Sequence, residues 1–192
     1  MEELELKVIL TEKEYSFLAH VFKFFDIKSV QQFNHYYDDT DKSYNKSGIT
    51  CRIREKNNDY VATVKYHRGR GHATEYKRKV INQYDCSLFS SMDVFYQGVL
   101  RTNRMVFEPV YGIKMMLDKN TYLDNVDYEL EIEHIKEMGR IALKILKGIS
   151  IFLQHMGVVK DSSEFYKRHK NSKTKSERFY ERKSSEKGER VS

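Results

Sequence analysis

The stretch VDYELEIEH at residues 126–134 alternates between acidic and apolar side chains. Successive side chains of a strand point to opposite faces, so the stretch predicts a strand with Glu129, Glu131 and Glu133 on one face. In an antiparallel sheet one face is ordinarily buried and the other solvated, so three aligned glutamates alone describe a solvent-facing surface. Their meaning depends on whether neighbouring strands carry charge in the same way.

Several other short segments show the same one-sided charge. The residues that share a face within their segment are Glu3, Glu5 and Lys7 in 2–10, Arg52 and Arg54 in 49–56, Lys65 with Thr63 in 60–67, and Lys114 and Asp118 in 111–118. Residues 31–38, 73–81 and 99–107 are further strand candidates. Residues 39–46 predict a polar turn and residues 86–97 a short helix. Many short strands at regular spacing are typical of a sandwich or a barrel.

Two amphipathic helices are predicted outside the sheet. Thr11 followed by Glu14 is a capping-box pattern, and residues 12–25 continue with apolar side chains at helical spacing. Residues 137–157 predict a second helix with an apolar stripe. Both helices need an apolar surface, which the apolar strand faces supply, so the charged faces are left for the other side. In an open sheet those faces meet solvent, whereas in a closed barrel they line the lumen.

A lumen lined with charge is costly unless water or bound ions compensate it. Carboxylates bind hard cations such as Mg²⁺ or Mn²⁺, and Arg and Lys side chains bind phosphate oxygens. Both kinds of residue occur on the charged faces, so the pattern predicts an anionic substrate at one wall and a metal ion at another. The net charge of +6 agrees with a polyanionic partner but does not choose among nucleotides, polyphosphate, nucleic acid and membrane phosphates.

The length of 192 residues suits one compact domain, which we place at residues 1–180. The basic tail at 181–192 is predicted to be disordered from its composition. Cys51 and Cys86 form no metal-spaced pair, so a reduced, cytoplasmic protein is the simplest interpretation. The acidic first residues do not read as a signal peptide, and no apolar run reaches the length of a membrane span.

Six segments, in chain order, resemble motifs of the CYTH superfamily, the triphosphate tunnel metalloenzymes. ELELK at 3–7 resembles the ExExK signature, YYDDTD at 36–41 the YYDT segment, CRIR at 51–54 the LRIR strand, TVK at 63–65 the TLK strand, MMLD at 115–118 the apolar strand ending in aspartate, and YELEIE at 128–133 the final acidic strand. Six pieces in order, with matching face parity, make a specific signal. The resemblance covers about residues 2–157 and is nearest to a bacterial, triphosphatase-like branch.

The resemblance implies an α+β fold: a closed eight-stranded antiparallel β-barrel, the triphosphate tunnel, with helices packed outside. It implies metal ligands among Glu3, Glu5, Asp118, Glu129, Glu131 and Glu133, with Mg²⁺ or Mn²⁺ as the cofactor. It implies substrate binding by Lys7, Arg52, Arg54, Lys65, Glu75, Arg104 and Lys114, and a catalytic set of Glu3, Glu5, Lys7, Glu129 and Glu131. The glutamate pair on the last strand stays open between Glu129 with Glu131 and Glu131 with Glu133. Arg101 has the opposite parity and ranks lower.

The implied activity is metal-dependent hydrolysis of a triphosphate, with inorganic tripolyphosphate ahead of nucleoside or thiamine triphosphate. Two alternatives stay open: cyclisation of ATP, as in class IV adenylyl cyclases, and binding of a nucleotide or polyphosphate without turnover. One departure bears on this choice, because ATEYK at 73–77 keeps only Glu75 of the family's Arg-x-Glu-x-Glu and has Lys77 in place of an acid. The expected partner is a triphosphate-containing small molecule, with no membrane partner. The oligomeric state stays open between monomer and homodimer.

The basic segment at 167–187 is either a solvated tail or a surface that touches RNA, and we do not expect a nucleic-acid partner. Its interleaved aromatic residues predict that part of it folds back. KSERF at 175–179 resembles a Lys-x-x-Arg-Phe ending of the bacterial branch. In the family such a segment covers the tunnel, which implies that Lys173, Lys175 and Arg178 approach the phosphates.

Overall fold

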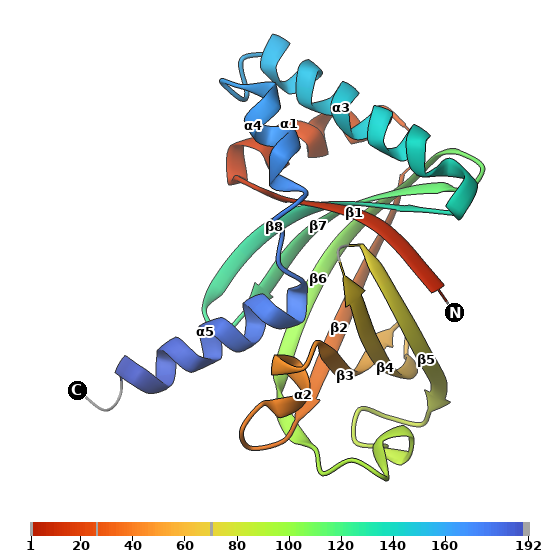
Figure 1. Cartoon of the computed structure of the whole chain (residues 1–192), viewed down its shortest axis with the longest axis vertical. Helices are drawn as coiled ribbons and strands as arrows, with labels where there is room; N and C mark the ends of the chain where they lie inside the picture. The colour runs from red at the N-terminus through yellow and green to blue at the C-terminus, as the bar shows by residue number, and fades with distance from the viewer. Residues whose placement is uncertain (1, 26, 70, 190–192) are drawn as a thin grey trace.

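Eight antiparallel strands close into one barrel in a computed structural model that describes residues 2–25, 27–69 and 71–189 (Figure 1). The strands are β1 (Glu2–Leu10), β2 (Lys28–Asp38), β3 (Ile49–Lys56), β4 (Asp59–Gly69), β5 (His72–Val80), β6 (Phe95–Val110), β7 (Ile113–Tyr122) and β8 (Asn125–His134). Their order around the barrel is β1-β5-β4-β3-β2-β6-β7-β8. The prediction of a closed eight-stranded antiparallel barrel is confirmed.

The helices connect and cover the strands. They are α1 (Glu12–Phe22), α2 (Ser43–Lys46), η1 (Ser87–Phe89), η2 (Lys136–Met138), α3 (Gly139–His155), α4 (Ser162–Arg168) and α5 (Lys175–Glu189). α1 begins at the predicted capping box, in which the Thr11 hydroxyl accepts from the Glu14 amide and the Glu14 carboxylate accepts from the Thr11 amide. None of the helices in the described ranges combines the length and apolarity needed to cross a membrane.

α1, α3 and α4 form a layer over the outer face of β1, β7 and β8 (Figure 1). The apolar residues that alternate with the lumen charges make this core, and its fully buried members include Val8, Leu117, Leu130, Ile132, Ala142 and Leu153. Burial of such side chains contributes about 1.5–3 kcal/mol each. The layer therefore fixes the charged face of these strands toward the lumen, because the apolar face is already covered.

The barrel closes through a short seam between β1 and β5. Residues 2–4 pair with residues 72–74, and from Glu5 onward β1 pairs with β8. The Glu5 amide donates to the Gly71 carbonyl at 2.9 Å, and a Cβ at Gly71 would lie 2.2 Å from the Glu5 carbonyl oxygen. Gly71 also has a φ of +69°, so both space and backbone conformation require glycine where the seam ends.

α5 fills one end of the barrel. Phe179 is fully buried there and stacks against Tyr36 and Tyr122, with ring centroids 4.9 and 6.1 Å away. Gly98 makes room for this ring, since a Cβ at that position would lie 2.8 Å from the Phe179 Cζ. Tyr36 is thus a core residue at this end of the barrel.

Three local expectations differ from the structure. Within residues 86–97 only η1 is helical, and β6 already begins at Phe95 because Phe95 pairs with Asp38 at the end of β2. The predicted turn at 39–46 contains the short α2. The predicted disordered tail is helical up to Glu189, since α5 is anchored by Phe179, and residues 190–192 lie outside the described residues.

Candidate active site

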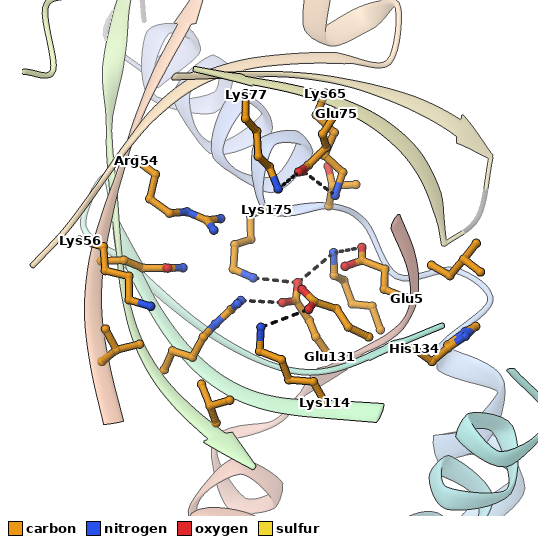
Figure 2. Close-up of a pocket in the computed structure, with 18 of the residues that line it drawn as sticks. Glu5, Arg54, Lys56, Lys65, Glu75, Lys77, Lys114, Glu131, His134 and Lys175 are labelled. Carbon is orange, nitrogen blue, oxygen red and sulfur yellow. Dashed lines mark hydrogen bonds and ion pairs between the residues drawn. The ribbon is translucent and has the colours of Figure 1, made fainter. Parts of the chain in front are cut away.

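A cavity of about 760 Å³ occupies the barrel lumen (Figure 2), and its lining includes Tyr111 and Gly112 of the turn between β6 and β7. Ten of the predicted site residues line it: Glu5, Lys7, Arg52, Arg54, Lys65, Glu75, Arg104, Lys114, Glu131 and Glu133. They come from seven strands, whose lumen-facing positions follow the period-two pattern. Closure of the barrel therefore gathers charges that are far apart in the sequence.

The remaining predicted residues lie in different places. Asp118 and Glu129 are fully buried below the cavity lining. Glu3 pairs with Ala73 across the β1–β5 seam, and its side chain lies outside the described residues. Arg101 is exposed, in keeping with its opposite parity.

A second cavity of about 440 Å³ lies at the side of the lumen, next to the β1–β5 seam. It shares Glu5, Lys7, Lys65 and His67 with the first cavity, and its outer wall includes His169 of the segment between α4 and α5. The central charges of the lumen can therefore be approached from two sides.

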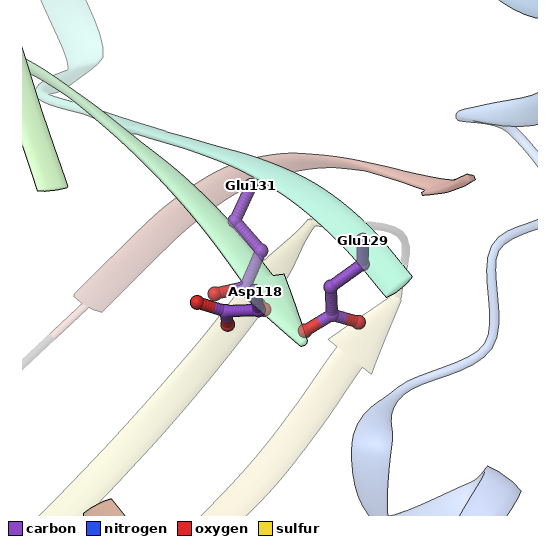
Figure 3. Close-up of side chains that lie close together, drawn as sticks. All are labelled: Asp118, Glu129 and Glu131. Atoms are coloured by element: carbon purple, nitrogen blue, oxygen red, sulfur yellow. The ribbon is translucent and has the colours of Figure 1, made fainter. Parts of the chain in front are cut away.

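Three carboxylates meet on the β7–β8 wall and form the acidic triad: Asp118, Glu129 and Glu131 (Figure 3). Their ligand oxygens lie within 4.8 Å of one another. The strand register explains this proximity, since Asp118 is directly opposite Glu129 and Glu131 is two residues further along the same face. Sequence alone could place the three on one surface but could not bring them to one point.

Four cationic side chains contact the triad. Arg104 donates to both Asp118 oxygens at 2.8 and 2.6 Å and to Glu131 at 2.6 Å. Lys175 reaches in from the first residue of α5, and its Nζ lies 2.9 Å from Asp118 Oδ2, 2.9 Å from Glu131 Oε1 and in contact with Glu129.

The other two cations come from opposite sides. Arg178 of α5 donates to Glu129 at 2.7 Å and is itself held by Asp127, whose carboxylate accepts from the Arg178 Nε at 2.8 Å. Lys7 of β1 lies 3.3 Å from Glu131 and 3.1 Å from Glu5. These contacts neutralise carboxylates that burial would otherwise destabilise.

The triad fits a hard divalent cation by its donor chemistry. Its three side chains offer only carboxylate oxygens, which Mg²⁺ and Mn²⁺ prefer, and the oxygens converge on one point. Of the other predicted ligands, Glu5 shares a contact with the triad, because Lys7 pairs with both Glu5 and Glu131. Glu133 instead pairs with Lys114 at 3.3 Å. The geometry thus favours Glu129 and Glu131 over Glu131 and Glu133 as the pair on β8.

The opposite wall, built from β3, β4 and β5, is cationic around one carboxylate. Glu75 lies 3.6 Å from Arg52 and 3.6 Å from Lys65, and Lys77 also contacts it. Burial alone would raise the pKa of Glu75, but the charges of Arg52 and Lys65 and the hydrogen bond from Lys77 lower it to about 2. Glu75 is therefore a counter-ion of the cations at neutral pH and a poor proton acceptor.

Arg54 carries a positive charge without a carboxylate partner among the described residues. Its Nε donates to the neutral Asn34 amide oxygen at 3.0 Å. Burial, with repulsion from Arg52 and Arg104, lowers its pKa to about 9. A buried guanidinium beside two others is an arrangement that a bound polyanion stabilises.

The electrostatics of β1 and β4 complete the site. Burial would raise the Glu5 pKa, but Lys7 and Lys65 outweigh it and lower the value to about 2. Burial, with Lys65 and Lys7 nearby, lowers the pKa of His67 to about 4, so this imidazole is neutral at pH 7. The lumen therefore keeps Glu5 and Glu75 charged, whereas burial lowers the pKa of Lys175 well below its usual value despite the opposing effect of the Asp118 charge.

Several lumen residues were absent from the predicted set. Lys56 and Lys77 line the cavity and continue the faces of Arg54 and Glu75 by two residues, so strand parity could have found them (Figure 2). Asn34 shares a face with Tyr36 on β2 and could have been found in the same way. The contacts of Lys175 and Arg178 with individual carboxylates had no sequence signal beyond the resemblance of KSERF, because they depend on how α5 docks.

The chain is similar in sequence to known proteins. A family profile described as the CYTH domain matches residues 1–155. The Bacillus subtilis (strain 168) protein named "Putative triphosphatase YjbK" is 30% identical over 167 residues, covering 78% of this chain and 87% of that protein.

Solved structures share the fold. A protein of Bacillus halodurans (bh2851), described as a "putative adenylate cyclase", has a TM-score of 0.62 at 24% identity, covering 78% of this chain and 91% of that one. HpAC1 from Hippeastrum, described as a "putative adenylyl cyclase" with a dominant triphosphatase activity, has a TM-score of 0.64 at 20% identity, covering 81% and 88%. At these identities the two structures support the barrel architecture alone.

Proposed function

The chain belongs to the CYTH domain family, and from this premise we propose that it hydrolyses a triphosphate in the barrel lumen with the help of a divalent metal ion. The single observation that carries the proposal is the polarity of the lumen. Glu131 of the acidic triad on β7 and β8 lines the same cavity as the cationic side chains of β3, β4 and β5. A triphosphate chain needs cations around it, and a divalent ion needs carboxylates.

The chain's own residues divide the work. Lys7, Arg52, Arg54 and Lys65 bind phosphoryl oxygens and orient the chain across the cavity. Arg104 keeps Asp118 and Glu131 in place through its fork of hydrogen bonds. Bound at the triad, Mg²⁺ or Mn²⁺ would neutralise charge that develops on the transferring phosphoryl group. Glu5 and the triad glutamates retain their roles in the proposed catalytic set, and Glu3 is included from its motif.

Inorganic tripolyphosphate is the leading substrate within this proposal. The tyrosines that line the described part of the cavity are Tyr36 and Tyr111. Tyr36 is 1% exposed and packed on Phe179, whereas Tyr111 lies at the rim with 91% of its surface exposed. Neither offers an enclosed face for a nucleobase or a thiamine ring, whereas the cations match phosphate directly.

We also propose that the protein resides in the reducing cytoplasm. Cys51 and Cys86 are both free thiols, and Cys51 is buried. Two free thiols, one of them buried, agree with a reducing environment.

The test is a product assay with the purified protein. Tripolyphosphate, ATP and thiamine triphosphate are each incubated with Mg²⁺ or Mn²⁺, and the products are separated by ion-exchange chromatography. We expect metal-dependent release of orthophosphate, fastest from tripolyphosphate. Asp118→Asn should reduce the rate by about 100-fold or more, because it removes a buried charge from the triad. Asp93→Asn changes an exposed aspartate outside the cavity and should leave the rate unchanged.

Other outcomes would change the assignment. Cyclic AMP as the product from ATP would assign a cyclase. Tight binding of tripolyphosphate with no product over hours would assign a binding module. Equal rates for Asp118→Asn and the unmodified protein would remove the acidic triad from the reaction.

A further inference from the structure

We propose that Lys175 is the resident counter-ion of the acidic triad and leaves it when metal and anion bind, so that the two binding events are coupled through this side chain. The inference rests on the proposed function and adds a role for the first residue of α5. Lys175 does not take part in the reaction itself; it controls whether the three carboxylates of the triad are available to a metal ion, and we therefore class it as a positioning residue. The order of loading then follows from the residues: metal alone binds weakly, and metal with polyanion binds well.

The geometry shows that the ammonium takes the place of a cation. The Lys175 Nζ lies among the same three carboxylates whose oxygens converge, 2.9 Å from Asp118, 2.9 Å from Glu131 and in contact with Glu129. Figure 2 shows its approach to Glu131. A metal ion would need those oxygens within about 2.0–2.1 Å for Mg²⁺. An ammonium and a divalent ion cannot both take that position, so one excludes the other.

The charge balance predicts that a metal ion displaces Lys175 readily only when an anion is bound as well. Three carboxylates face Lys175, Arg104 and Arg178, and Lys7 touches Glu131 as well. A divalent ion added to this group brings two charges that no free carboxylate of the triad compensates. A polyanion in the cavity supplies that compensation and offers oxygen acceptors for the displaced ammonium.

The displacement needs movement of the side chain and not of the helix. α5 stays anchored by the fully buried Phe179 and by the pairing of Arg178 with Asp127. Thr174 and Ser176 line the cavity on either side of Lys175, so the ammonium enters open lumen when its flexible four-carbon stem rotates. The phosphate-binding cations lie across this space.

A purely structural role makes a different prediction. If Lys175 only neutralised the triad, its removal would lower stability without improving the affinity for metal ions. If it competes with metal, its removal frees three carboxylates and tightens metal binding. The sign of the change in metal affinity therefore separates the two roles.

The experiment is a calorimetric titration of the full chain with Mn²⁺, with and without sulfate as a weakly chelating tetrahedral anion. For Lys175→Met we expect Mn²⁺ alone to bind about tenfold more tightly than in the unmodified protein. Sulfate should improve Mn²⁺ binding to the unmodified protein but have little effect on Lys175→Met. Lys173→Met is the matched control, because Lys173, which the resemblance placed near the phosphates, is instead exposed, pairs with Glu181 at 2.7 Å and is not among the lining residues of the cavity.

Lys175→Arg and a crystal structure with bound Mn²⁺ and sulfate provide two further tests. Lys175→Arg retains the cation and should bind Mn²⁺ no more tightly than the unmodified protein. If Lys175→Met does not fold, a crystal structure of the unmodified protein with Mn²⁺ and sulfate decides. Nζ outside hydrogen-bonding distance of the triad supports the coupling, and Nζ still bound to all three carboxylates overturns it. Unchanged or weaker Mn²⁺ affinity in a folded Lys175→Met also overturns it.

The change in Mn²⁺ affinity and the release of phosphate can be measured independently of each other. The titration requires no turnover, so tighter Mn²⁺ binding in Lys175→Met stands even if no triphosphate releases phosphate. Conversely, rapid phosphate release together with unchanged Mn²⁺ affinity leaves the function intact and removes the coupling.

Discussion

At the scale of single residues, Arg54 is a buried charge that no carboxylate among the described residues pairs with. The side chain is held by a neutral amide, faces two further arginines, and has a pKa lowered to about 9 by burial and by those neighbours. Such a group opposes folding of the ligand-free protein and favours binding of an anion. Activity and stability should therefore respond to its removal with opposite signs.

The substitution Arg54→Gln tests this opposition. Glutamine keeps a polar group near Asn34 but removes the charge, so we expect the melting temperature to rise by about 2–4 °C. The kcat/KM for tripolyphosphate should fall by about 100-fold or more, because a cation that contacts the phosphates is lost. Thermal melts and initial rates give the two quantities.

The control for Arg54 is Arg101→Gln, a substitution on the exposed outer face of β6. It should change neither quantity. A melting temperature that falls together with the activity of Arg54→Gln would show that Arg54 is needed for the fold itself.

At the scale of elements, α5 decides the shape of the lumen. It fills one barrel end with Phe179 and delivers Lys175 and Arg178 to the triad. The Phe179 ring packs directly against Gly98 of β6, where any side chain would collide with it. The segment is rich in Lys, Arg, Ser and Glu, and this composition predicted a solvated tail. The structure differs because two adjacent aromatic side chains, Phe179 and Tyr180, are buried and hold the helix on the barrel.

We expect Phe179→Ala to lower the free energy of unfolding by about 3–5 kcal/mol, since the ring is fully buried among aromatic side chains. Urea unfolding measures this loss, and limited proteolysis should show earlier cleavage within α5. Glu181→Ala, at an exposed position of the same helix, should change the unfolding midpoint little. Unfolding of Phe179→Ala at the urea concentration of the unmodified protein would mean that α5 does not seal the barrel.

At the scale of the whole molecule, the barrel surrounds its buried carboxylates with Lys and Arg side chains from neighbouring strands and from α5. Glu5 and Glu75 both have pKa values lowered to about 2, against 4.5 for an ordinary glutamate, because nearby Lys and Arg charges outweigh burial. A carboxyl with a lowered folded-state pKa contributes stability above its unfolded value and loses it as the pH falls. The stabilisation is therefore complete above about pH 5 and disappears toward pH 2.

The predicted consequence is a pH-dependent effect of Glu75→Gln. At pH 7 the variant should unfold at lower urea than the unmodified protein, since Arg52, Lys65 and Lys77 lose their counter-ion. The difference should shrink steadily as the pH falls from 5 toward 3, because Glu75 of the unmodified protein takes up a proton in the unfolded state while it is still ionised in the folded state. Urea midpoints at several pH values measure it.

A constant difference between Glu75→Gln and the unmodified protein across pH would contradict the lowered pKa of Glu75. The exposed Glu137→Gln serves as the control and should show no difference at any pH.

The sequence by itself determined which side chains share a face. The alternation of strands such as β8 and β3 is a local property of extended backbone, in which residues two apart point the same way. It therefore predicted the lumen residues Glu131, Arg52 and Arg54 without knowledge of strand neighbours, and the ordered motifs predicted the barrel and its family.

Only the tertiary structure decided which of those charges meet. The register of β7 on β8 brings Asp118 opposite Glu129. The docking of α5 brings Lys175 to Glu131, a residue 44 positions earlier in the chain. Contacts of this kind depend on the packing of distant segments and on the apolar anchor of Phe179, so no local pattern encodes them. The β8 stretch thus carried the acidic face in its own residues, and the fold brought two of its glutamates together with Asp118 of β7 into the acidic triad.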